Sequence, residues 1–336
     1  MKSQKSIFDK KAIKHFYKDV LHHLLPKARH QSIGYFGPAE ATRAGNMRID
    51  LAETNDINIG SPYFYTKPYS FIHFTSVPVL IHILKSKKLR LYNLRGMDDK
   101  LEFTIPLYSN GKTLSEYEIS EIKKKIFCLS MCQTSLEDRS QSLSAWREYG
   151  DKGNGVGMVL SFEEKFKTNW VNFMLSQVCY TKTSHQKFQA LRNLYKEFSI
   201  KYNLTINNFD EIMYKYFAFH KHRIYKDEKE VRLLYCEGTS YIDEPPIHYD
   251  INRKNQKTSY IELDLEWDWT QKQREFIMKQ GITPHMVRPI ISIDKIIFGY
   301  RISNHAKYEI ADVIQELSKD YKKKPVIVNS KLQDQF

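Results

Sequence analysis

Glycine is scarce in this sequence, with 13 residues among 336. Neither a G-x-G-x-x-G fingerprint nor a G-x-x-x-x-G-K-[S/T] loop occurs along the chain. Both motifs rely on glycine to bring the backbone close to a phosphate. Their absence argues against a dinucleotide-binding Rossmann domain and against a P-loop NTPase.

Cysteine is also sparse, at Cys128, Cys132, Cys179 and Cys236. The spacing offers no paired C-x-x-C or accompanying histidine pair, which argues against a zinc site, and we expect no metal ligands. Three of the four lie in apolar runs, where a cysteine is usually a small buried hydrophobe. This usage is typical of a reducing cytoplasm, and we expect a cytoplasmic protein.

Long hydrophobic runs are missing as well. No window approaches 18 uncharged apolar residues, so we expect no membrane span and no membrane partner. Residues 1–19 carry charges throughout and do not resemble a signal peptide.

The chain is rich in aromatic and basic side chains. Hydrophobic residues make up 41% and aromatic residues 13%, which is enough to bury a sizeable core. The formal net charge is +13, and such a surplus attracts polyanions, nucleic acid among them. A lysine-rich but merely solvated surface is the alternative explanation.

Hydrophobic periodicity predicts helices and strands that interleave without a regular βαβ rhythm. This pattern indicates an α+β fold with a mixed or antiparallel central sheet and helical elaborations. We expect strands near residues 70–75, 89–92, 125–130, 155–162, 230–235, 290–298 and 326–328, and helices near 6–25, 77–84, 144–149, 184–219 and 303–319.

We expect two regions. Residues 1–65 form an N-terminal helical extension with an irregular stretch at 32–67, and residues 66–336 form one α+β domain with a helical insertion at about 184–222. The apolar stripe of the first helix must be buried, either on its own domain or against a protein partner.

The first candidate site is Phe71-Ile-His-Phe-Thr-Ser76, a strand that ends in small polar residues before a helix. Alternation places His73 and Thr75 on one face, where they could hydrogen-bond a ribose or an amide. Alternatively His73 is a satisfied, partly buried histidine and Ser76 only caps the helix.

The second candidate site is Asp227-Glu-Lys-Glu-Val-Arg232. In an extended chain Glu228, Glu230 and Arg232 project to one face. They could be an ion-paired solvent edge, or a catalytic edge in which a carboxylate stabilises positive charge and Arg232 holds it in place.

The third candidate is the segment Ser144 to Val156, in which Trp146 and Tyr149 lie three residues apart, ahead of a glycine-rich turn. Residues with this spacing share one side of a helix. Aromatic rings beside a turn that can approach a ligand suit a base or a nicotinamide ring. An aromatic core anchor followed by a tight turn explains the segment equally well.

These segments resemble one family. The strings FIHFTSVPVLIHILKSKKLRLYNLRGMDDKLEF, CLSMCQTSLEDRSQSLSAWREYGDKGNGVGMVLSF, KDEKEVRLLY, IDKIIFG and KPVIVNS occur in the order of domain-of-unknown-function family 2971. The resemblance covers residues 71 to 336 approximately. It departs from the family at Gly96-Met-Asp-Asp-Lys, where the family tends to have Asn-Asp-Pro.

A weaker resemblance implies a chemistry. The histidine-bearing strand, the following helix and the Lys-Lys-Leu strand resemble the opening of ADP-ribosyltransferase-like folds, including the DNA-modifying DarT-like group. This resemblance implies that NAD is a substrate, that His73 and Thr75 hold a ribose, and that Tyr149 or Trp146 stacks on the nicotinamide. It also implies that Glu230 stabilises the ribosyl cation while Glu228 or Arg232 orients the acceptor.

Two other functions remain open. The chain could be a non-enzymatic nucleic-acid- or protein-binding module that uses its basic surface, including Lys85, Lys87, Lys88, Arg90 and Lys322–Lys324. A metal-dependent nuclease would use Asp98, Asp99 and Glu102, together with Glu228 or Glu230, to bind Mg²⁺. The family resemblance implies a role in bacterial defence or toxin systems.

Overall fold

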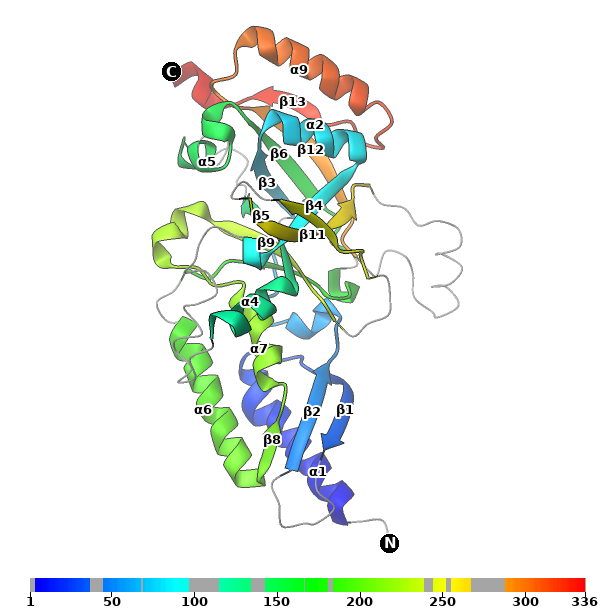
Figure 1. The fold of residues 1–336 in the computed structure, drawn as a ribbon, viewed down its shortest axis with the longest axis vertical. Coiled ribbons are helices and arrows are strands. Elements are labelled where there is room, and N and C mark those ends of the chain that lie inside the picture. Colours follow the sequence, from blue (N-terminus) through cyan, green and yellow to red (C-terminus); the bar gives the residue numbers. More distant parts are fainter. Residues whose placement is uncertain are drawn as a thin grey trace.

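The computed structural model contains one large sheet, a smaller sheet and several helices (Figure 1). It describes residues 4–36, 45–67, 69–96, 115–133, 143–165, 167–180, 184–238, 244–251, 255–266 and 288–335. The expected α+β class is therefore confirmed.

Ten strands of the described chain form the large sheet, and its pairing is mixed. The strand order is β10-β11-β4-β5-β3-β6-β12-β13, and β9 pairs with both β5 and β7. Among the strand pairs of this sheet in the described chain, only β12 and β13 run parallel. The strands are β3 (Ser70–Thr75), β4 (Lys88–Asn93), β5 (Ile126–Gln133), β6 (Val156–Phe162), β7 (Phe173–Gln177), β9 (Glu230–Cys236), β10 (His248–Ile251), β11 (Lys257–Asp264), β12 (Ile291–Phe298) and β13 (Val326–Asn329).

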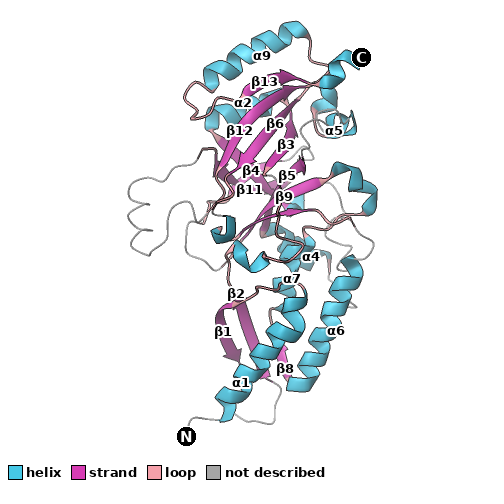
Figure 2. Cartoon of the chain, turned by 180° about the vertical axis from the view of Figure 1, so that it is seen from behind, coloured by secondary structure: helices cyan, strands magenta, loops and turns pink. Residues whose placement is uncertain are grey.

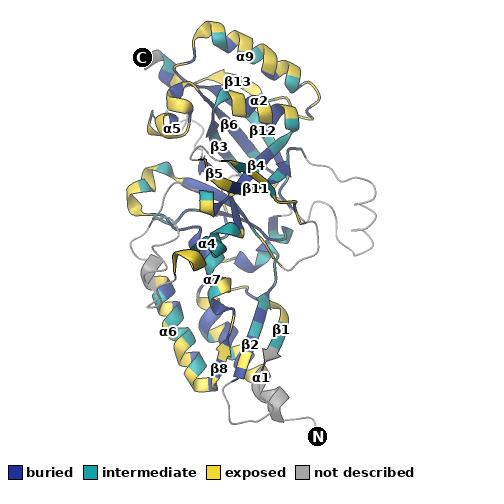
Figure 3. Ribbon diagram, viewed as in Figure 1, coloured by how far each residue is buried: buried dark blue, intermediate teal, exposed yellow. Residues whose placement is uncertain are grey.

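Helices cover both faces of this sheet. Helices α2 (Val77–Ser86) and α9 (Asn304–Leu317) contact each other and bury Leu80, Leu84 and Ile314 against one face. The short helix α5 (Leu143–Glu148) packs Trp146 with Ile72 and Val159 on the opposite face. Figure 3 shows the strands largely buried and much of α9 exposed.

Helix α2 follows from its local sequence. Ser76 occupies the N-cap position, and Pro78 lies in the first turn, where a missing N–H costs nothing. Leu80, Ile83 and Leu84 recur at helical spacing and are all buried. The helix ends at Lys87, whose φ of 53° lies in the left-handed region.

A second group of elements lies at the N-terminal end of the molecule (Figures 1 and 2). Strands β1 and β2 pair antiparallel, and β2 pairs parallel with β8. The elements are α1 (Gln4–His15), β1 (His30–Phe36), β2 (Gly45–Leu51), α4 (Glu116–Lys124), α6 (Ser184–Tyr202), β8 (Leu204–Ile206) and α7 (Phe209–Phe217). After α1 the chain continues as a π-helical turn (Phe16–Val20) and a 3₁₀ turn (Leu21–His23).

The apolar stripe of the first helix packs within the chain. The Phe16 ring is fully buried, and its centroid lies 5.3 Å from that of Phe198 and 6.3 Å from that of Phe209. The N-terminal helix therefore shares a core with α6 and α7. The boundary near residue 65, and a protein partner for this helix, remain predictions.

Several elements differ from the sequence expectations. Residues 32–67 are not wholly irregular, because they contribute to β1 and contain β2. The span 184–219, expected to be helical, is divided into α6 and α7 by β8. Strands β7, β10 and β11 and helix α4 were not anticipated. The sequences of β10, β11 and α4 carry more polar residues than most central strands, whereas β7 is short but largely apolar. None of the helices that the structure describes is both long and apolar enough to cross a membrane.

Candidate functional site

The candidate site lies where β3 and β4 separate along one edge of β5. Strand β3 pairs with β5 at Ile72 and Cys132, whereas β4 pairs with β5 at Tyr92 and Cys128. Between these two pairs lies Ser130, for which neither β3 nor β4 supplies a register partner within their described residues.

The peptide group of Ser130 faces this gap. On the other edge of β5, the Gln133 N–H donates to the Lys229 carbonyl at 3.0 Å. Because β5 and β9 are antiparallel, every second residue of β5 is hydrogen-bonded to β9, and these are the odd-numbered residues. Alternation in an antiparallel ladder then turns the N–H and C=O of Ser130 toward the edge shared by β3 and β4. Ser130 thus presents backbone polar groups at the gap.

A cavity of about 850 Å³ opens at the same place. His73 and Thr75 from β3, Tyr92 from β4 and Ser130 from β5 line it, together with Tyr149, which follows α5. His73 and Thr75 both line it, as expected from the sequence, and Phe74 between them also contributes to its wall. Its volume is in the range of small-molecule sites in proteins.

His73 is fixed by Ser130. The His73 Nδ1 atom lies 2.9 Å from the Ser130 carbonyl oxygen. Because a carbonyl only accepts, Nδ1 carries the proton, and in the neutral ring Nε2 is left as an acceptor. Burial lowers the pKa of His73, although the bond to the Ser130 carbonyl opposes this shift. The ring is therefore neutral at physiological pH.

Glu230 begins β9 and is 3% exposed. Its Oε1 accepts hydrogen bonds from the Ser130 hydroxyl and, at 2.7 Å, from Arg232 Nε, and its Oε2 accepts from Arg232 Nη2 at 3.0 Å. Burial by itself raises the pKa of this carboxyl, but Arg232, Lys221 and Ser130 together hold the pKa below its usual range. Glu230 is therefore an ionised carboxylate in a dry environment.

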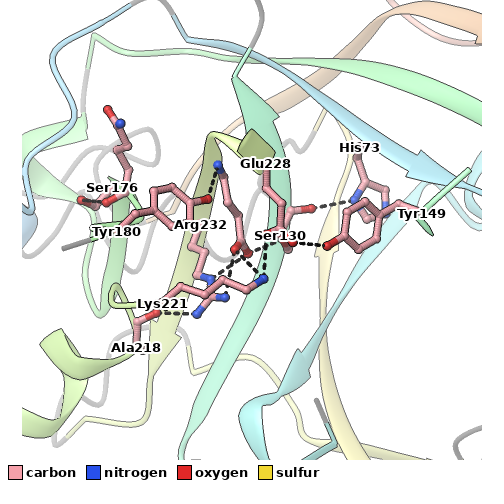
Figure 4. A network of polar contacts seen from close by, with 11 residues as sticks. His73, Ser130, Tyr149, Ser176, Tyr180, Ala218, Lys221, Glu228 and Arg232 are labelled. Atoms are coloured by element: carbon pink, nitrogen blue, oxygen red, sulfur yellow. Dashed lines mark hydrogen bonds and ion pairs between the residues drawn. The ribbon is translucent and has the colours of Figure 1, made fainter. Parts of the chain in front are cut away.

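Arg232 is 2% exposed, and its guanidinium binds the Glu230 carboxylate (Figure 4). Besides Glu230 it donates from Nη1 to the Ala218 carbonyl oxygen at 2.6 Å. A buried guanidinium with these partners fixes the carboxylate in one orientation. Arg232 does not line the cavity, and neither do Glu228 and Glu230, so none of the three is placed for direct contact with a cofactor there. Glu230 is connected to the cavity wall through the Ser130 hydroxyl, and Glu228 through the Tyr149 hydroxyl.

Glu228 reaches the site by a route that the sequence did not predict. It ends a 3₁₀ helix (Arg223–Glu228), and Lys229, with a φ of 42°, separates it from β9. The expectation that Glu228 and Glu230 follow one extended strand is therefore wrong. Lys221 nevertheless joins them, because its Nζ lies 2.7 Å from Glu228 Oε2 and 3.4 Å from Glu230 Oε2.

Tyr149 links this charged group to the cavity. Its hydroxyl donates to Glu228 Oε1 at 2.6 Å, and its side chain points toward Glu228 in Figure 4. Burial, reinforced by the negative charge of Glu228, raises the pKa of Tyr149. The residue is still 45% exposed, so its ring remains available to a ligand.

Trp146 takes a different role from the one expected for it. It is fully buried, and its ring lies edge-on to Phe74 at 4.9 Å. Phe74 alternates with His73 along β3, so Trp146 packs on the face opposite His73 and Thr75. Its placement therefore supports the aromatic-anchor interpretation and not nicotinamide stacking.

The glycine-rich turn after Tyr149 packs against other strands. A Cβ on Gly155 would meet the Thr75 carbonyl oxygen at 2.2 Å, and one on Gly299 would meet the Gly153 carbonyl oxygen at 2.2 Å. The glycines therefore let three backbone segments meet. Their close approach is to the chain itself and holds the end of β3, which carries Thr75, in place.

Two residues of the site were missed by the sequence reasoning. Ser130 is a polar residue within the apolar run of β5, and this local signal could have identified it. Lys221 lies in a basic loop without periodicity, and only the fold brings it to Glu230.

A second cavity, of about 760 Å³, lies between β2, α4 and α7. Many charges along its wall are already paired with one another. Arg48, for example, lies 2.9 Å from Asp50 and 3.1 Å from Glu211. None of the catalytic or cofactor-binding residues expected from the sequence lines it, whereas His73, Thr75 and Tyr149 line the cavity at Ser130.

The nuclease alternative would require a metal centre. No group of three or more His, Cys, Asp or Glu side chains with metal-site geometry occurs among the residues with described positions. Asp98, Asp99 and Glu102, the carboxylates of the nuclease alternative, lie outside the described residues.

The comparisons with known proteins agree with the resemblance seen in the sequence. The family described as "Protein of unknown function (DUF2971)" matches residues 145–233, a segment that carries Trp146, Tyr149, Glu228, Glu230 and Arg232. The resemblance is thus confirmed for this part of the chain. No curated protein matches the sequence. No solved structure matches it either.

Proposed function

We propose that this chain is an NAD-dependent ADP-ribosyltransferase-like enzyme whose active site is the cavity at Ser130. The observation that carries the proposal is the junction at this residue. Its carbonyl holds His73, its hydroxyl holds Glu230, and Ser130 itself lines the cavity. Ser130 thereby connects His73 with Glu230, although these two residues lie 157 positions apart in the sequence.

The charge of Glu230 suits the chemistry of NAD cleavage. When the bond between the ribose C1′ and the nicotinamide nitrogen breaks, nicotinamide leaves with the bonding electrons and the ribose acquires positive charge. A nearby carboxylate that stays ionised stabilises this cation, and the low dielectric of a buried site strengthens the effect. Arg232 and Lys221 keep Glu230 in the ionised form that this role requires.

The polar groups at the gap suit a carboxamide. His73 Nε2 is an acceptor in the neutral ring, and the Ser130 N–H is a donor turned toward the same edge of β5. The amide of nicotinamide offers the complementary donor and acceptor. The half-exposed ring of Tyr149 in the cavity wall supplies an aromatic surface for the base.

The acceptor of the ADP-ribose decides between transferase and glycohydrolase. Attack by water at C1′ gives ADP-ribose, and attack by a nucleophile of another molecule gives an ADP-ribosylated product. The net charge of +13 favours a polyanionic acceptor such as nucleic acid, consistent with a role in bacterial defence.

A non-enzymatic nucleic-acid-binding module is the second candidate. It is favoured by β10 beside the cavity, where Tyr249 is 63% exposed and Lys257 Nζ lies 4.1 Å from its ring centroid. Exposed aromatic rings with cations bind single-stranded nucleic acid. In this case binding is salt-dependent and needs no NAD.

The test measures nicotinamide release from NAD by the purified chain, alone and with single-stranded DNA or RNA. We expect release by the wild type and a loss of at least about 100-fold in E230Q, because the variant removes the charge opposite the ribosyl cation. E230D keeps the charge but withdraws it by one methylene, so it should also be impaired. E237Q, at an exposed acid just beyond β9, should match the wild type.

Circular dichroism establishes that each variant is folded. E230D protects the test against misfolding of E230Q, because it retains a negative charge for Arg232. Full turnover by either folded Glu230 variant would contradict the assignment. No turnover by the wild type, together with salt-dependent binding of nucleic acid, would favour the binding module.

A further inference from the structure

We propose that Lys221 is a positioning residue that joins Glu228 to Glu230 and holds them against Tyr149 and Ser130, the cavity residues that they contact. The predicted effect on nicotinamide release rests on the proposed function. The predicted effect on the free energy of unfolding does not depend on NAD.

The geometry places one ammonium group between two acids. Lys221 Nζ lies 2.7 Å from Glu228 Oε2 and 3.4 Å from Glu230 Oε2. The side chains of Lys221, Glu228 and Glu230 are 10%, 18% and 4% exposed. Such burial limits screening by solvent and salt, so this bridge is stronger than a surface ion pair.

Lys221 is held by a backbone contact and by a side-chain contact. Its backbone N–H donates to the Cys179 carbonyl at 3.2 Å, and its ammonium lies 4.7 Å from the centroid of the Tyr225 ring. An anchored backbone and an aromatic neighbour restrict where Nζ can go. Lys221 is thus a fixed cation and not a mobile surface lysine.

Arg232 and Lys221 have different tasks. Arg232 makes a bidentate contact with Glu230, whereas Lys221 contacts both acids. Two carboxylates around one site repel each other unless a cation lies between them. Without Lys221, Glu228 would lose its link to Glu230, and its remaining contact in this group would be the Tyr149 hydroxyl.

The charged and titratable groups around Glu230 come from several elements. The Tyr180 hydroxyl, after β7, accepts a hydrogen bond from the Glu230 N–H at 2.8 Å. The other groups are Arg232 on β9, Ser130 and Cys132 on β5, Lys221 and Glu228 on the segment before β9, and Tyr149, which contacts Glu228. Of these, Arg232 and Lys221 are the cations that lower the pKa of Glu230.

The direction of the pH effect follows from these contacts. A carboxylate with a lowered folded-state pKa adds stability above its unfolded pKa, about 4.3 for glutamate, and loses it as the pH falls through the folded-state pKa. Replacing Lys221 by methionine removes one of the cations, so the folded-state pKa of Glu230 rises. The acid limb of any Glu230-dependent activity then moves to higher pH.

The experiment compares K221M, K221R and a control, K319M, in the full chain. Lys319 also lies 2.7 Å from a glutamate, Glu316, but that pair is exposed. We expect K221M to lower nicotinamide release about tenfold at neutral pH and to move the acid limb upward. K221R keeps the cation and should restore the acid limb, while K319M should match the wild type.

A double-mutant cycle of K221M and E230Q gives the NAD-independent readout. Unfolding free energies measured across pH 3 to 7 should show coupling between the two positions that is largest above about pH 5 and shrinks as the pH falls toward the folded-state pKa of Glu230. Such coupling in a protein that does not turn over NAD supports the role of Lys221 and rejects only the proposed function. Absence of coupling at every pH, with all variants folded, overturns the role of Lys221.

Discussion

Trp146 and Tyr149 lie only three residues apart, but one packs in the core and the other lines the cavity. Trp146 is fully buried on Phe74, whereas Tyr149 follows the last residue of α5 and lines the cavity. Burying a large aromatic side chain contributes several kcal/mol to stability, and an exposed ring contributes to recognition instead. The two residues should therefore respond differently to substitution.

The paired variants W146F and Y149A test this division. W146F should lower the free energy of unfolding by about 1–3 kcal/mol, because it leaves a gap against Phe74, and should leave the KM for NAD unchanged. Y149A should raise that KM, because it removes the aromatic surface of the cavity. Thermal unfolding and steady-state kinetics of both variants give the comparison, and the reverse pattern would restore the stacking role to Trp146.

At the scale of elements, the site depends on how β3 is held between β5 and β6. The turn at 150–155 brings Gly155 against the carbonyl of Thr75, and the Gly155 carbonyl accepts the Gly299 N–H at 2.9 Å. The end of β3 is thus fixed by backbone contacts that a side chain at Gly155 would obstruct. Thr75 and the cavity wall depend on this packing.

A substitution of Gly155 by alanine should therefore affect both stability and the site. The added Cβ would lie 2.2 Å from the Thr75 carbonyl oxygen, and a backbone carbonyl cannot rotate away as a flexible side chain can. We expect a loss of about 2–4 kcal/mol in the free energy of unfolding, measured by chemical denaturation. The control is G157A on β6, whose Cβ would meet the Ile72 side chain at 3.2 Å, and it should cost less. Equal losses in both variants would argue against the backbone contact as the cause.

At the scale of the whole molecule, the sequence predicted the class of fold and much of the central sheet. Strands β3, β5, β6, β9 and β12 are apolar enough to be recognised, and Pro78 marks the start of α2. The peripheral strands β10 and β11 carry more polar residues, because one face or edge is solvated, and they were missed.

The candidate site was predicted only in part, for a physical reason. His73 and Glu230 could be picked out by residue type and local pattern. Their connection depends on the register of β5 with β3, β4 and β9, and register comes from long-range pairing. The 3₁₀ helix that carries Glu228 and the loop that carries Lys221 have no sequence period, so their convergence required the fold.

The whole-molecule charge bears on the acceptor and not on the site itself. A net charge of +13 attracts polyanions at a distance, and this attraction weakens as salt screens it. Glu230 and Arg232 are buried, and the ion pair between them should respond much less to salt. The two properties can therefore be separated by experiment.

The most direct test of the central claim is a crystal structure of the wild-type chain with a non-cleavable NAD analogue in which a methylene replaces the ring oxygen of the nicotinamide ribose. The account predicts the analogue in the cavity at Ser130, with its carboxamide hydrogen-bonded to His73 Nε2 and the Ser130 N–H and its ring against Tyr149. An analogue bound in the second cavity beside Arg48, or no bound analogue at saturating concentration, would contradict it.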